Sequence, residues 1–205
     1  MTKPKRTVSP PQAAMPDAEP CRYLVRFKTS LVKRWSHTRM SGLYEQLDLA
    51  VYLWALEREE EALEILRSTT AAIPAPPMSS GGVDYNVWCP VATTNALEAR
   101  ICRVAGDTEA AAVPTARIMA DPGVADNRSY IADKVAEAEN KFGGAAAEKS
   151  VKWACHRLSR TLMDLFLFGE LAAAGHEFAA YYDPEEVERL IAAGRAALHA
   201  RLSTA

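Results

Sequence analysis

The chain has 205 residues, of which 49% are hydrophobic and 24% are charged, and its formal net charge at pH 7 is -2. This balance is typical of a folded domain of ordinary size, and it argues against an intrinsically disordered chain or a general polyanion binder. Nine basic and two acidic side chains lie in residues 1–40, so this segment carries about +7 and the remainder about -9.

Residues 1–19 contain Pro4, Pro10, Pro11 and Pro16 without apolar periodicity. Proline cannot sustain a helix, and so polar a segment cannot bury enough surface to offset its ordering entropy. We therefore predict a flexible N-terminal arm over residues 1–19 and a single all-helical domain over residues 20–205. Because no apolar run follows the basic start, we expect no secretory signal peptide and a cytoplasmic location.

A basic amphipathic helix is predicted over residues 22–39. Leu24, Phe27, Leu31 and Trp35 recur at steps of three and four residues, and most of the basic side chains lie elsewhere on the helix. The ordinary use of such a helix is to cover the core of its own domain. The alternative is an adaptor whose basic face binds an anionic membrane surface or a nucleic acid.

Two helices joined by a short turn are predicted next. Ser41 is a candidate N-cap for the first helix, and Leu47, Val51 and Trp54 lie on its broad apolar face. The second helix is predicted over residues 59–73, where several glutamates face solvent near the positive helix start. Because the turn between the two helices is so short, we expect an antiparallel hairpin.

A further pair of helices follows the Pro- and Gly-rich loop at residues 74–84. Proline is favoured at the first position of a helix, so Pro90 predicts a helix that begins there. Gly106 is predicted to end it, because glycine tolerates the left-handed conformation that closes a last turn. Asp107 or Thr108 then caps a shorter helix.

Local sequence signals also mark the ends of two predicted helices in the C-terminal part of the chain. Asp126 is a candidate N-cap for a modest amphipathic helix, which is predicted to stop at Gly143-Gly144. Asp183-Pro184 has the pattern of an N-cap followed by a first-position proline, and it predicts the start of the last helix.

The longest periodic stretch spans residues 145–174 and is predicted to end at Gly175. Asp164 and Glu170 interrupt its most apolar part, which is also too short to cross a bilayer. We therefore predict a core helix and no transmembrane segment. No run in the chain shows the period-two alternation of a strand, so the predicted fold class is all-α.

Three tracts share the plan of an apolar helix, a tight polar turn and a second helix. Their turns are Ala174-Gly175-His176-Glu177, Ala105-Gly106-Asp107-Thr108 and, less closely, Ala55-Leu56-Glu57-Arg58. Over about half of the chain, this plan resembles the helix-turn-helix repeats of tetratricopeptide-like (TPR-like) proteins. The resemblance implies antiparallel helical hairpins in an irregular TPR-like bundle that serves as a protein-binding scaffold.

Cys89 is the candidate for a catalytic nucleophile. It directly precedes Pro90, and a thiol at a helix start has a lowered pKa. The alternative interpretation is a small buried hydrophobe. The four cysteines form no C-x-x-C pair, and the histidines show neither the H-E-x-x-H nor the E-x-x-H spacing. We therefore expect no metal site and no cofactor.

Protein binding without catalysis is the function that we expect. The candidate binding residues are acidic or aromatic: Glu57, Glu60, Glu61, Glu64, Tyr85, Trp88, Tyr181 and Tyr182. In general character, a small all-helical chain with an acidic body and no catalytic motif resembles bacterial immunity proteins, which neutralise toxins. This resemblance implies a partner protein rather than a nucleic acid. A thiol-dependent enzyme that uses Cys89 is the alternative.

Overall fold

The structure, a computed structural model, describes residues 24, 27, 41–72, 85–121, 123 and 128–204. The described residues form helices and no strand, which confirms the predicted all-α class. The elements are α2 (Ser41–Ala55), α3 (Glu59–Ala72), α4 (Tyr85–Val104), α5 (Thr108–Met119), α7 (Arg128–Ala147), α8 (Val151–Ala173), the 3₁₀ helix η1 (Glu177–Tyr181) and α9 (Pro184–Ser203).

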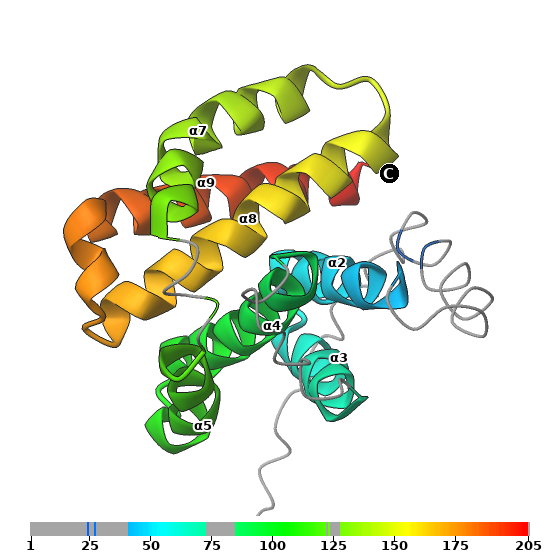
Figure 1. The fold of residues 1–205 in the computed structure, drawn as a ribbon. Helices are drawn as coiled ribbons and strands as arrows, with labels where there is room; N and C mark the ends of the chain where they lie inside the picture. The colour runs from blue at the N-terminus through cyan, green and yellow to red at the C-terminus, as the bar shows by residue number, and fades with distance from the viewer. Residues whose placement is uncertain are drawn as a thin grey trace, which may run out of the picture.

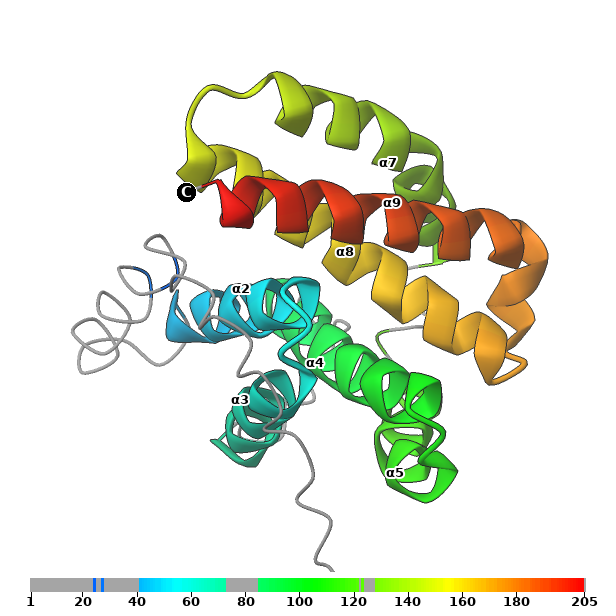
Figure 2. The same ribbon diagram turned by 180° about the vertical axis from the view of Figure 1, so that it is seen from behind.

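The helices form two groups that meet along α8. Helices α7 and α9 both pack on α8, and the three lie together in both views (Figures 1 and 2). Helices α2, α3, α4 and α5 form the second group, in which α4 contacts both α3 and α5. Helices α2 and α4 also pack against α8, so one hydrophobic core joins the two groups.

Helix α8 is the core helix that its sequence predicts. Fourteen of its 23 residues are buried, on more than one side of the helix. Leu158, Leu162 and Phe166 are completely enclosed, and the Phe166 ring makes an edge contact with Trp54 of α2 at a centroid distance of 4.9 Å. Of the helix predicted over residues 22–39, the structure describes only Leu24 and Phe27, which are helical and pack on the same core. Its basic residues lie outside the described residues, as does the arm predicted over residues 1–19.

Three helix ends close in the same way. Glu57, Gly106 and Gly175 have the positive φ angles of 61°, 81° and 72°. In each turn, the backbone N–H of the residue that follows donates a 2.9 Å hydrogen bond to the carbonyl five positions before it. These bonds run from Arg58 to Leu53, from Asp107 to Cys102 and from His176 to Leu171. This is the Schellman closure expected at Gly106 and Gly175. In the α2–α3 turn, the left-handed residue is Glu57. The comparison of the three turn sequences instead placed Leu56 opposite the two glycines.

The predicted caps of α5 and α9 are confirmed. The Asp107 carboxylate accepts a hydrogen bond from the backbone N–H of Ala110 at 2.9 Å. The Asp183 carboxylate accepts one from the N–H of Glu185 at 3.0 Å, with Pro184 at the first helical position. Each cap satisfies an amide that the helix itself leaves without a carbonyl partner.

The predicted end of α7 at Gly143-Gly144 is wrong, because α7 continues to Ala147 and α8 begins only at Val151. Neither glycine adopts a positive φ angle, so neither closes the helix. A side chain from a distant part of the chain contacts the end of α7. The Arg201 guanidinium of α9 donates hydrogen bonds to the carbonyls of Ala146 at 2.5 Å and Glu148 at 3.1 Å. It thereby caps carbonyls that have no partner within the helix.

The predicted start of α4 at Pro90 is also wrong, because α4 begins at Tyr85. Pro90 is the sixth residue of the helix, so the only helical bond that it cannot form is the one to the carbonyl of Asn86. Cys89 is therefore the fifth residue of α4. The helix dipole acts mainly on side chains of the first turn, and Cys89 lies beyond that turn. This position removes the reason for expecting an activated thiol at Cys89.

Candidate functional site

A groove with an acidic rim lies where the α2–α3 turn, the end of α4 and the middle of α9 come together. Its volume is about 690 Å³. We call it the acidic groove, and it is lined by Trp54, Glu57, Arg58, Glu59, Glu60, Glu61, Arg100, Ile101, Val104, Ala105, Glu188, Ile191, Ala192 and Arg195.

Two carboxylates on the rim of the acidic groove are not neutralised by any described residue. The arginines that line the groove are all engaged: Arg58 pairs with Glu61 at 2.5 Å, Arg195 with Glu59 at 2.5 Å and Arg100 with Glu188 at 2.5 Å. Glu57 and Glu60 are exposed, and neither side-chain carboxylate forms a hydrogen bond or ion pair with the part of the chain that the structure describes. Among the described residues, these two carboxylates have no compensating positive charge.

The floor of the same groove is apolar. Ile101 and Ile191 close it from α4 and α9, and both are buried. Val104, at the end of α4, is 69% exposed, the largest value among the exposed large hydrophobic side chains that the structure describes. The exposed side chain of Val104 and the exposed carboxylates of Glu57 and Glu60 therefore share one groove.

Arg195 holds the walls of the acidic groove together. Its guanidinium donates hydrogen bonds to the Trp54 carbonyl at 2.8 Å and to the Glu59 carboxylate at 2.5 Å. It also lies over the Trp54 ring, 4.6 Å from the centroid, in a cation–π contact. One side chain of α9 thus fixes the position of the α2–α3 turn.

A network of four charges adjoins the groove, and Arg100 and Glu188 of this network also line it. Glu170 of α8 is only 2% exposed and accepts two hydrogen bonds from Arg103, at 2.7 and 3.0 Å. Arg100 makes the same bidentate contact with Glu188, at 2.5 and 2.9 Å. The hydrogen bonds from Arg100 hold the pKa of Glu188 below its ordinary value. Gly169 makes room for this network, since a Cβ atom there would lie 3.3 Å from both Arg100 and Glu188.

The structure brings together some of the predicted binding residues and separates others. Glu57, Glu60 and Glu61 line the acidic groove, whereas Glu64 lies exposed on α3 outside its lining. Tyr181 is 53% exposed at the end of η1, away from this groove. Tyr182 is half-buried, donates a hydrogen bond to the Phe168 carbonyl at 2.8 Å, and has a pKa that burial raises.

The aromatic candidates of α4 and the candidate nucleophile are only partly placed. Tyr85, Trp88 and Cys89 belong to α4, but their side chains lie outside the described residues. Of the described cysteines, Cys102 and Cys155 are both buried. Burial raises the pKa of the Cys102 thiol, which is opposite to the shift that a nucleophile needs.

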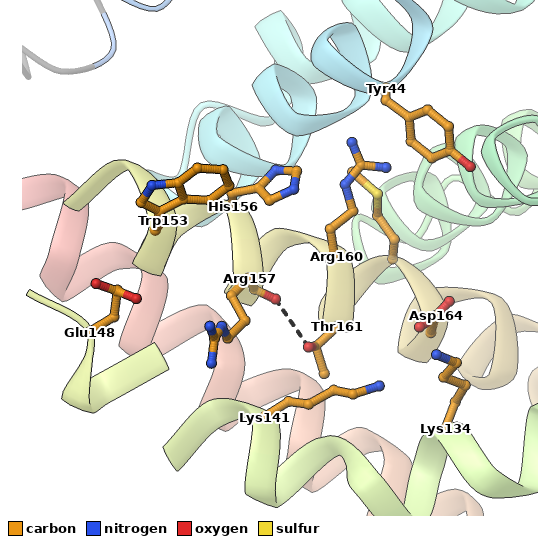
Figure 3. Close-up of a pocket in the computed structure, with 11 residues that line it drawn as sticks. Tyr44, Lys134, Lys141, Glu148, Trp153, His156, Arg157, Arg160, Thr161 and Asp164 are labelled. Carbon is orange, nitrogen blue, oxygen red and sulfur yellow. Dashed lines mark hydrogen bonds between the residues drawn. The ribbon is translucent and has the colours of Figure 1, made fainter. Parts of the chain in front are cut away.

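A second groove lies between α7 and α8, beside the start of α2, with a volume of about 800 Å³ (Figure 3). We call it the basic groove, and it is lined by Tyr44, Lys134, Lys141, Glu148, Trp153, His156, Arg157, Arg160, Thr161, Met163 and Asp164. The sequence-based predictions did not include this groove. Part of the signal is in the sequence, since Trp153 and the polar residues at 156, 157, 160, 161 and 164 recur at steps of three and four.

Buried Asp48 of α2 organises one wall of the basic groove. Its carboxylate accepts a 2.7 Å hydrogen bond from the Ser159 hydroxyl and lies 3.2 Å from Nδ1 of His156. The same carboxylate is 3.4 Å from the Arg160 guanidinium, which stacks on the Tyr44 ring at 3.9 Å from the centroid. Arg160 therefore points toward α2, as Figure 3 shows, and away from the interior of the groove.

Comparison with known proteins gives no guide to function. No family model, curated protein or solved structure matches the chain. Among the described residues, no group of three or more His, Cys, Asp and Glu side chains is placed to hold a metal ion. None of the described helices has the length and hydropathy needed to cross a lipid bilayer. Function is therefore inferred from the chemistry of the two grooves.

Proposed function

We propose that the protein is a non-enzymatic interaction module that binds a basic, amphipathic segment of a partner protein in the acidic groove. One observation carries this proposal: the exposed carboxylates of Glu57 and Glu60 have no partner in the described chain and stand beside the exposed side chain of Val104. A lysine or arginine of the partner would neutralise the carboxylates, and an apolar residue would cover the valine.

Charge on a larger scale supports the same choice of partner. The chain beyond residue 40 carries about -9, so a basic partner would be attracted before contact and would associate faster at low salt. A bacterial toxin neutralised by an immunity protein is one partner of this kind. The acidic rim disfavours acidic partners and nucleic acids, because like charges would meet there.

The groove is also held in place before any ligand arrives. Arg195 ties α9 to the α2–α3 turn, and the Arg100–Glu188 and Arg103–Glu170 pairs tie α4 to α8 and α9. Rigid walls lower the ordering entropy that binding must overcome. The three Schellman turns and the packing of consecutive helices favour a TPR-like arrangement of antiparallel hairpins, in which a groove between helices is the binding surface.

The test is a fluorescence anisotropy titration with a short helical peptide that has lysines on one face and leucines on the other. The double variant Glu57→Gln/Glu60→Gln should weaken binding about tenfold, or about 1.4 kcal/mol, as expected for the loss of two rim ion pairs. Val104→Ser should weaken it by a similar factor, because less apolar surface is covered. A peptide with glutamates in place of the lysines should not bind.

The matched control is Glu64→Gln/Glu109→Gln, which removes two exposed carboxylates outside the groove. It causes the same change in net charge and should leave the peptide affinity within about twofold of the wild type. Equal weakening by the two double variants would show that only net charge attracts the peptide, and the proposed site would then be wrong.

A further inference from the structure

Helices α7 and α8 direct a row of polar side chains into the basic groove. Trp153, Arg157 and Thr161 follow each other on α8 at steps of four residues, so they share one face of the helix. Lys134 and Lys141 of α7 are seven residues apart and share the face that lies opposite. Figure 3 shows Arg157 and Lys141 extending into the space between the two helices.

The charges in this groove are unevenly compensated. Lys141 pairs with Glu137 at 2.8 Å, and Asp164 and Glu148 are the acidic side chains of the lining. Arg157 is exposed and forms no hydrogen bond or ion pair through its guanidinium with the described chain. The guanidinium therefore keeps its full set of donors for a ligand, and its planar fork suits a phosphate or carboxylate.

Lys134 and Lys141 of α7 are neighbours in the groove, and Figure 3 shows Lys134 beside Asp164 of α8. Burial lowers the pKa of Lys134, and the neighbouring charge of Lys141 lowers it further, while Asp164 acts in the opposite direction. Two cations placed side by side in a partly buried groove repel one another. An anion between them would remove this repulsion and gain charge-assisted hydrogen bonds from both.

An exposed indole lies at the opposite end of the same groove from Lys134 (Figure 3). Trp153 is 57% exposed, and it lies one helical turn from Arg157. The ring makes an edge contact with His156 at a centroid distance of 6.0 Å, and the Lys152 ammonium lies 5.6 Å from its centroid. An exposed indole beside a cationic groove is a stacking platform of the kind that binds nucleobases.

We propose that the basic groove binds a nucleotide, whose phosphates are held by Arg157, Lys141 and Lys134 and whose base stacks on Trp153. A volume of about 800 Å³ lies within the range of small-molecule sites. A bare phosphate would leave the indole uncovered, and an uncharged aromatic molecule would leave Arg157 without a partner. A nucleotide has both chemical groups in one molecule. This site is independent of the acidic groove.

The experiment is isothermal titration calorimetry of the full chain with ATP in the absence of divalent cations, at low ionic strength. Pyrophosphate and adenosine serve as partial ligands. We expect ATP to bind most tightly, pyrophosphate more weakly and adenosine least. Arg157→Gln and Lys141→Gln should each weaken ATP binding about tenfold or more, since each removes a charge-assisted hydrogen bond. Trp153→Ala should weaken ATP binding and leave pyrophosphate binding unchanged.

The matched control is Lys149→Gln, which removes an exposed cation in the α7–α8 turn that does not line the groove. Circular dichroism should show an unchanged helical signal for all four variants, because their side chains are exposed or half-buried. Absence of ATP binding at millimolar concentration would overturn the proposal. So would equal weakening by Lys149→Gln and Arg157→Gln, or pyrophosphate binding that depends on Trp153.

Discussion

Two helical glycines should respond to the same substitution in opposite directions. Gly194 is buried in α9, and a Cβ atom there would lie 2.7 Å from both Cδ2 of Leu162 and Cζ of Phe142. Gly143 is exposed in α7, and a Cβ atom there would meet nothing within 4 Å. Neither glycine has a positive φ angle, so the backbone accepts alanine at both positions.

For Gly194→Ala we expect the overpacking to outweigh the gain in helix propensity. Leu162 is fully enclosed and cannot move away, while Phe142 is only half-buried. Overpacking of a core costs about 1–3 kcal/mol, and replacing a helical glycine by alanine returns about 0.5–1 kcal/mol. The free energy of unfolding should therefore fall by about 1–2 kcal/mol. For Gly143→Ala only the gain remains, so stability should rise by about 0.5–1 kcal/mol.

Urea unfolding followed by circular dichroism at 222 nm measures both changes. With a slope of about 2–3 kcal/mol per molar urea, the midpoint should fall by roughly 0.5 M for Gly194→Ala and rise by roughly 0.3 M for Gly143→Ala. The slopes themselves should not change. A Gly194→Ala protein as stable as the wild type would refute the close approach of α7, α8 and α9 at this point.

Further substitutions probe the charged and polar contacts. The folded-state pKa of Glu188 lies below its ordinary 4.5 because Arg100 donates to it, so its contribution to stability is complete above that pH and is lost as the pH falls through the folded pKa. Glu188→Gln should therefore reduce the loss of stability below about pH 4.5 in acid titrations. Glu170→Ala removes the bidentate partner of the part-exposed Arg103 and leaves Glu188 as the remaining carboxylate beside Arg100 and Arg103. It should cost about 1–3 kcal/mol in urea unfolding. Tyr182→Phe removes the bond to the Phe168 carbonyl and should lower the thermal midpoint, at a cost of about 0.5–1.5 kcal/mol.

Local signals in the sequence were sufficient for most helix boundaries. Asp107 and Asp183 cap their helices as predicted, because an N-cap needs only its own side chain and the next few amides. Gly106 and Gly175 close theirs for an equally local reason. The end of α7 was beyond such reasoning, since the side chain that contacts it is Arg201, from a helix more than fifty residues away.

The grooves could be predicted only in part. The sequence indicated the glutamates of the α2–α3 turn as a binding surface, because they are close together in the chain. It could not place Val104 or Ile191 beside them, since this needs the packing of α4 and α9 around α8. The basic groove had a readable signal in the polar positions of α8, but the meaning of that signal depends on Lys141 of α7 lying opposite.

The left-handed backbone at Glu57 links the stability of the fold to the proposed binding in the acidic groove. An L-residue in this conformation is strained by about 1–2 kcal/mol, and glycine, which occupies the equivalent place in the other two turns, is not. The substitution Glu57→Gly would therefore raise the free energy of unfolding. It would also erase a carboxylate from the mouth of the acidic groove, so the more stable molecule would be the poorer binder.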